Sequence, residues 1–144
     1  MMNHKSNIKI WLARLLIGIV LGMNLLCAVD FIARPSLYMG SYELTGEVGK
    51  AVIVAFGILF LMWQVPYFFA LYHPKKYKTS LLQAILMQAI GLIGESLLLG
   101  TISSEHAILR GSITRFIIFD GGGLLFLVLA AVLTGFSFQS YQQE

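Results

Sequence analysis

The chain has 144 residues, of which 58% are apolar and 12% are charged, and its formal net charge is +3. Soluble domains average about half apolar and a quarter charged residues, so this composition excludes an ordinary soluble domain. Nucleic-acid binding is not expected, because the few basic residues are those that orient helices and hold lipid headgroups. A single cysteine excludes an intramolecular disulfide or a CxxC redox pair.

Four long apolar runs predict four membrane-spanning helices. The runs extend over Ile10 to Ile32, Ala51 to Tyr72, Ser80 to Thr101, and Ile113 to Phe138. Each approaches or exceeds the roughly 20 residues that a spanning helix needs. None alternates apolar and polar residues, so a membrane β-barrel is not favoured. The expected fold class is all-α: a polytopic membrane protein with a four-transmembrane-helix bundle, forming one membrane domain over residues 1–144.

The first run follows the basic residues Lys5 and Lys9 and could be mistaken for a secretory signal. It is too long for a typical signal and is followed by no A-x-A cleavage site, so we interpret it as an uncleaved helix. Cys27 lies in the sequence NLLCA, which resembles a lipoprotein site. Because Leu26 stands where a small residue is required, we expect no lipid attachment and assign Cys27 to helix packing.

The connections between the runs indicate the orientation. The longest, at about 33–50, combines Pro35 with glycines and acids, which favours turns and one short interfacial helix. Basic residues near helix ends prefer the cytoplasmic side. One side carries Lys5, Lys9, Arg14, Lys75, Lys76 and Lys78, and the other carries Arg34, Lys50, Arg110 and Arg115. This modest excess, with the compact HPKKYK connection, predicts that both termini are cytoplasmic and that the 33–50 connection lies outside. The expected location is a bacterial cytoplasmic membrane.

Aromatic residues with polar edges lie mostly near the predicted helix ends. They are Trp11, Tyr38, Tyr42, Tyr67, Tyr72, Tyr77 and Tyr141. Such rings favour the headgroup layer, and we interpret them as membrane anchors. An aromatic cage around a ligand is the alternative.

Two acids, Glu95 and Asp120, fall inside the third and fourth apolar runs. An ionised side chain at mid-bilayer costs roughly 2.5 to 3.5 kcal/mol, so such residues usually face the bundle interior, a partner or trapped water. Two arrangements remain open. In the first, the acids lie close together and hold a proton, which suits proton exchange or recognition of a polar or cationic group. In the second, Arg110 or Arg115 reaches inward as an ion-pair partner.

A rise of about 1.5 Å per residue places the intramembrane polar residues in two buried tiers. Asn24, Glu95 and Asp120 fall at a similar depth in the outer half, and Gln64 and Gln88 in the inner half. Gln88 and Glu95 are seven residues apart and share one helix face. Hydrogen bonding between helices would by itself explain the presence of the amide side chains. Carboxylates are less suited to this structural role, because they are readily charged. These five residues are the candidates for ligand binding or proton exchange.

Asp120 begins the sequence DGGG, and Pro66 interrupts the second run. Three glycines expose the backbone, which permits a bend, a close helix crossing, or contact with a lipid, quinone or pigment. Pro66 should kink its helix, with Gln64 available to compensate. No recognisable motif encodes a cofactor, and the histidines at 4, 73 and 106 are too dispersed for one metal site.

The segments RLLIGIVLGM and ELTGEVGKAVIVAFGILFL, in that order, resemble the DoxX-like group of small four-helix membrane proteins. The resemblance covers most of the chain in layout. It implies a compact bundle, some of whose members are accessory to membrane redox systems or act in assembly. It implies no particular site residues.

The leading hypothesis is an accessory or assembly subunit that docks onto a larger membrane complex, with a redox-related complex as one option. Its partners would be the lipid bilayer and other membrane subunits or further copies of itself. The alternative is a small-ligand-binding or proton-coupled carrier that uses buried Glu95 and Asp120. A membrane enzyme with these carboxylates as acid and base is a third class, which no nucleophile or cofactor motif supports.

Overall fold

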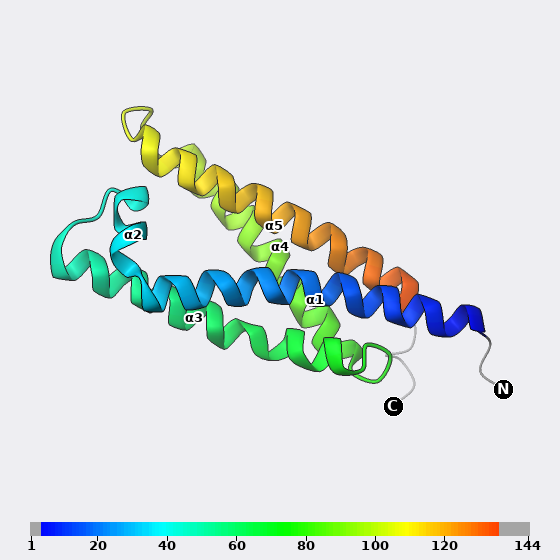
Figure 1. Cartoon of the computed structure of the whole chain (residues 1–144). Coiled ribbons are helices and arrows are strands. Elements are labelled where there is room, and N and C mark those ends of the chain that lie inside the picture. The colour runs from blue at the N-terminus through cyan, green and yellow to red at the C-terminus, as the bar shows by residue number, and fades with distance from the viewer. Residues whose placement is uncertain (1–3, 136–144) are drawn as a thin grey trace.

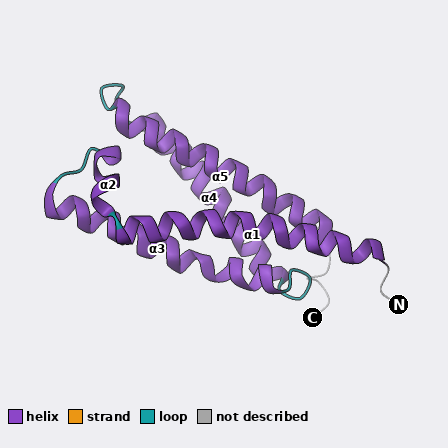
Figure 2. Ribbon diagram, in the orientation of Figure 1, coloured by secondary structure: helices purple, strands orange, loops and turns teal. Residues whose placement is uncertain are grey.

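The computed structural model describes residues 4–135. Its long helices are α1 (His4–Ala33), α3 (Gly46–Tyr72), α4 (Lys78–Thr101) and α5 (Ala107–Thr134), and two short elements, α2 (Pro35–Met39) and the 3-10 helix η1 (Gly40–Tyr42), follow α1 (Figures 1 and 2). All four long helices are long and apolar enough to cross a membrane. The prediction of an all-α bundle with four membrane-spanning helices is confirmed.

The helices extend beyond the apolar runs that predicted them. The helix expected from Ile113 begins at Ala107, and the one expected from Ala51 begins at Gly46. Apolarity alone misses these ends, because charged and polar residues continue a helix where it leaves the hydrocarbon. In the 33–50 connection, Pro35 occupies the first turn of α2, a position that needs no backbone N–H. Residues 136–138, which the fourth run included, lie outside the described part.

The helices pack as two adjoining pairs. α1 packs along α3, α4 packs along α5, and α1 also contacts α5, whereas the contact between α3 and α4 is the least extensive of these four (Figure 1). A core of buried apolar side chains, among them Ile17, Leu81 and Leu127, fills the space between the pairs. The start of α1, the end of α5 and the α3–α4 connection lie at one end of the bundle (Figure 1). The α3–α4 seam, the least extensive of these contacts, leaves room for one cavity.

The first turn of α5 is capped by a residue from a distant part of the chain. Glu43, directly after η1, accepts hydrogen bonds from the Leu109 backbone N–H (3.2 Å) and from His106 Nδ1 (2.5 Å). Glu43 is the only non-glycine residue of the described chain with a positive φ, at 55°. Because a carboxylate satisfies free N–H groups and favours the positive end of a helix, these contacts hold η1 against α5.

This cap predicts a pH-dependent stability. The hydrogen bonds from His106 and from the Leu109 backbone hold the pKa of the Glu43 carboxyl below its ordinary value of 4.5. A lowered pKa means that the stabilisation is fully present above pH 4.5 and is lost as the pH falls through the folded-state pKa. We expect Glu43→Gln to lower the Tm by a few degrees at neutral pH, with the difference from the unmodified protein disappearing in acid.

Thermal unfolding in detergent across this pH range measures the effect of Glu43→Gln. The control is Glu105→Gln, because Glu105 is exposed near the same turn and does not contact the α5 backbone in the described structure. A Tm difference for Glu43→Gln that persists at low pH would contradict the capping role.

Candidate functional site

The five polar residues singled out in the membrane-spanning helices line one cavity. Asn24 comes from α1, Gln64 from α3, Gln88 and Glu95 from α4, and Asp120 from α5, and the cavity volume is about 230 Å³. We call it the polar chamber. All four long helices contribute to it, so the chamber exists only in the assembled bundle.

A chain of hydrogen bonds links three helices at the wall of the chamber. The Tyr67 hydroxyl of α3 donates to Gln88 Oε1 of α4 (2.6 Å), and Gln88 Nε2 donates to Asp120 Oδ1 of α5 (2.8 Å). Asn24 of α1 interacts with the same Tyr67 hydroxyl. Gln88 and Asp120, expected in different tiers, therefore lie at the same level, because α5 begins at Ala107 and not at Ile113.

Two glycines allow this network to form. A Cβ at Gly123 would lie 2.6 Å from Gln88 Nε2, and a Cβ at Gly91 would occupy the position of the Asp120 carboxylate. Among the three glycines after Asp120, the third thus permits close approach between helices, which is one of the roles expected for the DGGG sequence. Gly91 lies on the same face of α4 as Gln88 and Glu95, so this face receives the Asp120 side chain.

The two carboxylates differ from the expectation in their burial. Asn24, Gln64 and Gln88 are buried, with exposed fractions of 4%, 1% and 3%, but Glu95 and Asp120 are only partly buried, and no charged residue of the described chain is fully buried. The prediction of two buried carboxylates is wrong in this respect. The reason is the loose α3–α4 seam, where exposed Trp63, Ile90 and Leu98 form the rim of the chamber.

Two oxygen atoms in the chamber have no hydrogen-bond partner in the described structure. They are Gln64 Oε1 and Glu95 Oε2, and both atoms are enclosed. The Gln64 amide nitrogen is satisfied, because it donates to the Phe60 carbonyl at 2.7 Å, one turn earlier in the helix that contains Pro66. An enclosed acceptor without a donor destabilises a folded protein by about 1 to 3 kcal/mol. A ligand that supplies hydrogen-bond donors to the chamber would remove this cost.

An aromatic cavity adjoins the polar chamber at Glu95. Its volume is about 250 Å³, and its lining includes Tyr42, Phe56, Phe60, Trp63 and Phe116 together with Glu95. The rings of Phe60 and Phe116 are stacked, with centroids 5.9 Å apart. We call this space the aromatic chamber. The two chambers together place a carboxylate between a polar wall and several aromatic faces.

The two arginines proposed as ion-pair partners contact neither acid in the described structure. Arg110 Nη1 donates to the carbonyl oxygens of Leu99 (2.9 Å) and Ile102 (2.5 Å), so it satisfies the free carbonyl end of α4. Arg115 Nη2 donates to Ser112 Oγ at 2.9 Å. Neither arginine lines the polar chamber.

Tyr67 is the residue of this site that the sequence interpretation missed. It was assigned to the membrane anchors, but its side chain is buried, with 2% exposed, and donates into the network. The available signal was spacing: Tyr67 lies three residues after Gln64 and shares its helix face. Of the other predicted anchors, Trp11 and Tyr72 are exposed, and Tyr141 lies outside the described residues.

The fold and the cavity define an integral membrane helical bundle with a partly open polar chamber inside the membrane-spanning region. No group of three or more His, Cys, Asp or Glu residues gathers as a metal site in the part of the chain that the structure describes. Comparisons with protein-family models, with curated proteins and with solved structures found no match to the chain.

Proposed function

We propose that the chain binds a small lipophilic ligand that carries a protonated amine. The observation that carries this proposal is the pair of enclosed, unpartnered acceptors, Gln64 Oε1 and Glu95 Oε2, on the wall of one cavity. An ammonium group has donors and no acceptor, so it is the kind of group that would satisfy such an atom. This proposal develops the alternative hypothesis from the sequence, a small-ligand-binding role for Glu95 and Asp120.

Charge favours an amine over a neutral donor. The polar chamber is lined by two carboxylic acids, Glu95 and Asp120, and by no lysine or arginine. A ligand cation would supply the missing partner for an acid in the membrane. The aromatic chamber supports the same ligand, because aromatic faces near a desolvated cation contribute about 0.5 to 2 kcal/mol.

Size and access favour a small ligand that arrives from the bilayer. The chambers measure about 230 and 250 Å³ and meet at Glu95, so an amine head and a single aromatic or short aliphatic body would fill them. Exposed apolar side chains rim the α3–α4 seam. A lipophilic molecule dissolved in the membrane would therefore reach the seam without crossing water.

The test compares phenylbutylamine with its neutral counterpart phenylbutanol. Calorimetry on the protein in nanodiscs, with empty nanodiscs as the reference, measures saturable binding beyond partition into lipid. We expect the amine to bind at least about tenfold more tightly than the alcohol, since hydrogen bonds to charged groups contribute about 1.5 to 3 kcal/mol. The double variant Glu95→Gln, Asp120→Asn should lose this preference.

Glu105→Gln is the matched control, because it removes an exposed carboxylate outside both chambers. It should bind the amine like the unmodified protein. Equal affinity for amine and alcohol, or an amine preference that survives in the double variant, would overturn the proposal.

The other expectations from the sequence stay predictions. Docking onto a larger membrane complex predicts co-purification in mild detergent, and the large exposed apolar faces of the helices suit a partner subunit and lipid equally. We likewise propose a relationship to DoxX-like proteins and coupling of Glu95 and Asp120 to proton transfer. We also propose a bacterial cytoplasmic membrane as the location, with both termini cytoplasmic. Accessibility labelling of cysteines introduced at either end of the bundle tests the orientation.

A further inference from the structure

Arg115 is an unusual residue for a membrane-spanning helix. It lies eight residues after the start of α5, which is about 12 Å along the helix axis. The 28 residues of α5 extend about 42 Å, more than the roughly 30 Å of a hydrocarbon core, so α5 projects from the core. Arg115 therefore lies near the boundary between hydrocarbon and headgroups, on the side of α2 and η1.

The guanidinium of Arg115 has no acidic partner among the described residues. It donates a hydrogen bond to Ser112 Oγ, and the ion pairs of the described chain join other residues. Arg115 is also exposed, although it stands in a helix otherwise dominated by apolar residues. A cation at this depth is stabilised by an anion or by a position at the headgroup layer.

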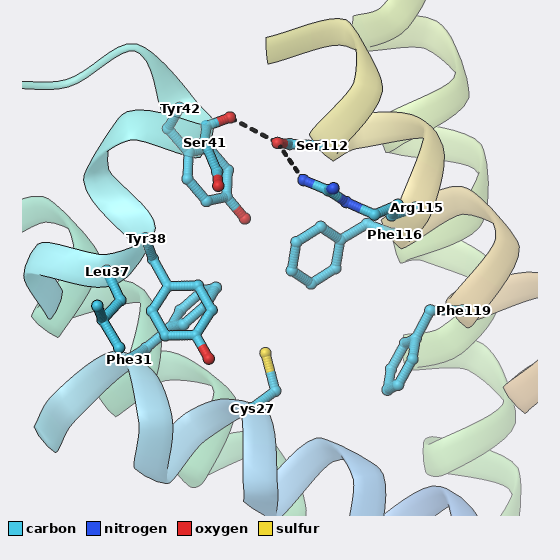
Figure 3. Close-up of a pocket in the computed structure, with 10 residues that line it drawn as sticks. All are labelled: Cys27, Phe31, Leu37, Tyr38, Ser41, Tyr42, Ser112, Arg115, Phe116 and Phe119. Atoms are coloured by element: carbon cyan, nitrogen blue, oxygen red, sulfur yellow. Dashed lines mark hydrogen bonds between the residues drawn. The ribbon is translucent and has the colours of Figure 1, made fainter. Parts of the chain in front are cut away.

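Arg115 lies at the edge of a cavity between α5 and the α2–η1 segment. The cavity has a volume of about 380 Å³ and is lined by aromatic rings, small polar groups and this one cation, with no acid (Figure 3). Figure 3 shows Tyr38 and Tyr42 on the α2–η1 side, and Arg115, Phe116 and Phe119 on the α5 side. The cavity thus combines a positive charge with an apolar floor.

An apolar groove continues from Arg115 along the seam between α1 and α5. It has a volume of about 420 Å³, shares Arg115 and Phe119 with the first cavity, and reaches Phe126, eleven residues or about 16 Å further along α5. Its wall includes Gly122, where a Cβ would meet no atom within 4 Å. The groove is open because a glycine stands where a side chain would fill it.

We propose that Arg115 and this groove form a binding site for an anionic phospholipid. The lipid phosphate would contact the Arg115 guanidinium, and one acyl chain would lie in the groove beside Gly122. Charge complementarity selects the occupant, because the cavity offers a guanidinium and no carboxylate to a bilayer that contains anionic headgroups. The site is independent of the amine-binding chambers, which carry the opposite charge.

Native mass spectrometry of the detergent-solubilised protein tests this site. The protein is titrated with phosphatidylglycerol and with phosphatidylcholine of the same acyl chains. We expect a preference for phosphatidylglycerol that Arg115→Gln lowers about fivefold, the effect of one cation on an anionic lipid. Arg115→Lys should retain most of the preference. Gly122→Leu should weaken binding of both lipids at least about threefold, because the leucine side chain fills the groove. This loss corresponds to roughly half of the free energy gained by burying one apolar side chain.

Two controls separate the site from general effects of charge and bulk. Arg14→Gln removes a cation from the opposite end of the bundle and should leave the lipid preference unchanged. Gly111→Leu adds the same bulk at an open position of α5 outside the groove and should leave both affinities unchanged. Circular dichroism of each variant verifies that the helices are formed.

Any of three results would overturn the proposal. The first is that Arg115→Gln still prefers phosphatidylglycerol, and the second is that Gly122→Leu binds both lipids like the unmodified protein. The third is that oleate displaces phosphatidylglycerol at equal concentration. The last result would assign the groove to a free fatty acid instead of a phospholipid. If Arg115→Gln fails to fold, the comparison of Gly122→Leu with Gly111→Leu decides the question.

Discussion

Gly57→Ala is expected to destabilise the bundle by about 1 to 3 kcal/mol, the cost of overpacking a close helix contact. A Cβ at Gly57 of α3 would lie 2.7 Å from Ile32 Cγ1 and 2.8 Å from the Ala28 carbonyl oxygen of α1. The Ile32 side chain can rotate away, but the carbonyl belongs to the helix backbone. The added methyl group would therefore push α1 and α3 apart around Gly57.

Thermal unfolding in detergent compares Gly57→Ala with Gly111→Ala. A Cβ at Gly111 of α5 meets no atom within 4 Å, so this control should be neutral or should gain up to about 1 kcal/mol from alanine's higher helix propensity. Because both variants replace a helical glycine with alanine, their difference isolates the steric effect. Equal stability of the two variants would show that α1 and α3 do not approach as closely as described.

Gly94→Leu is expected to weaken binding of phenylbutylamine at least about tenfold, because the leucine side chain would occupy space that the ligand needs. Gly94 lines the polar chamber next to Glu95, and a Cβ there meets no atom within 4 Å. The leucine would thus enter open space without a clash. Since leucine also favours a helix more than glycine does, the fold should be retained or slightly stabilised.

Gly100→Leu is the matched control for Gly94→Leu. It lies on the same helix, is equally free of contacts, and lines neither chamber. Calorimetry in nanodiscs should give unchanged amine affinity for this control. If the unmodified protein binds the amine and Gly94→Leu binds it equally well, the ligand occupies another site, whereas absence of binding to the unmodified protein rejects the ligand class itself.

The sequence was sufficient to predict the four helices and the polar residues that meet between them. Length and apolarity define a spanning helix, and an acid such as Glu95 or Asp120 inside one must face protein or water. Spacing on α4 also placed Gln88 and Glu95 on one face, and both line the polar chamber. These predictions depend on one helix at a time, which is why they succeed.

The features that depend on where helices begin and how they pack could not be predicted. The depth estimate placed Gln88 and Asp120 in separate tiers, yet a hydrogen bond of 2.8 Å joins them. The estimate started the last helix at Ile113, whereas α5 begins at Ala107, so Asp120 lies deeper than expected and level with Gln88. The role of Arg110 depends on the turn between α4 and α5, where it satisfies carbonyl groups and does not reach an acid. Partial exposure of the carboxylates likewise follows from the loose α3–α4 seam.

The carboxylate of Glu43 has a consequence for the order in which the chain matures. A backbone N–H in the first turn of the last long helix bonds an acceptor from a segment synthesised more than sixty residues earlier, since Glu43 and Leu109 are separated by 66 positions. The contact of η1 with α5 therefore forms last at this end of the bundle, after α5 has been synthesised. Cleavage of the chain between Glu43 and α3 would leave this acceptor joined to the bundle only through α1 and α2.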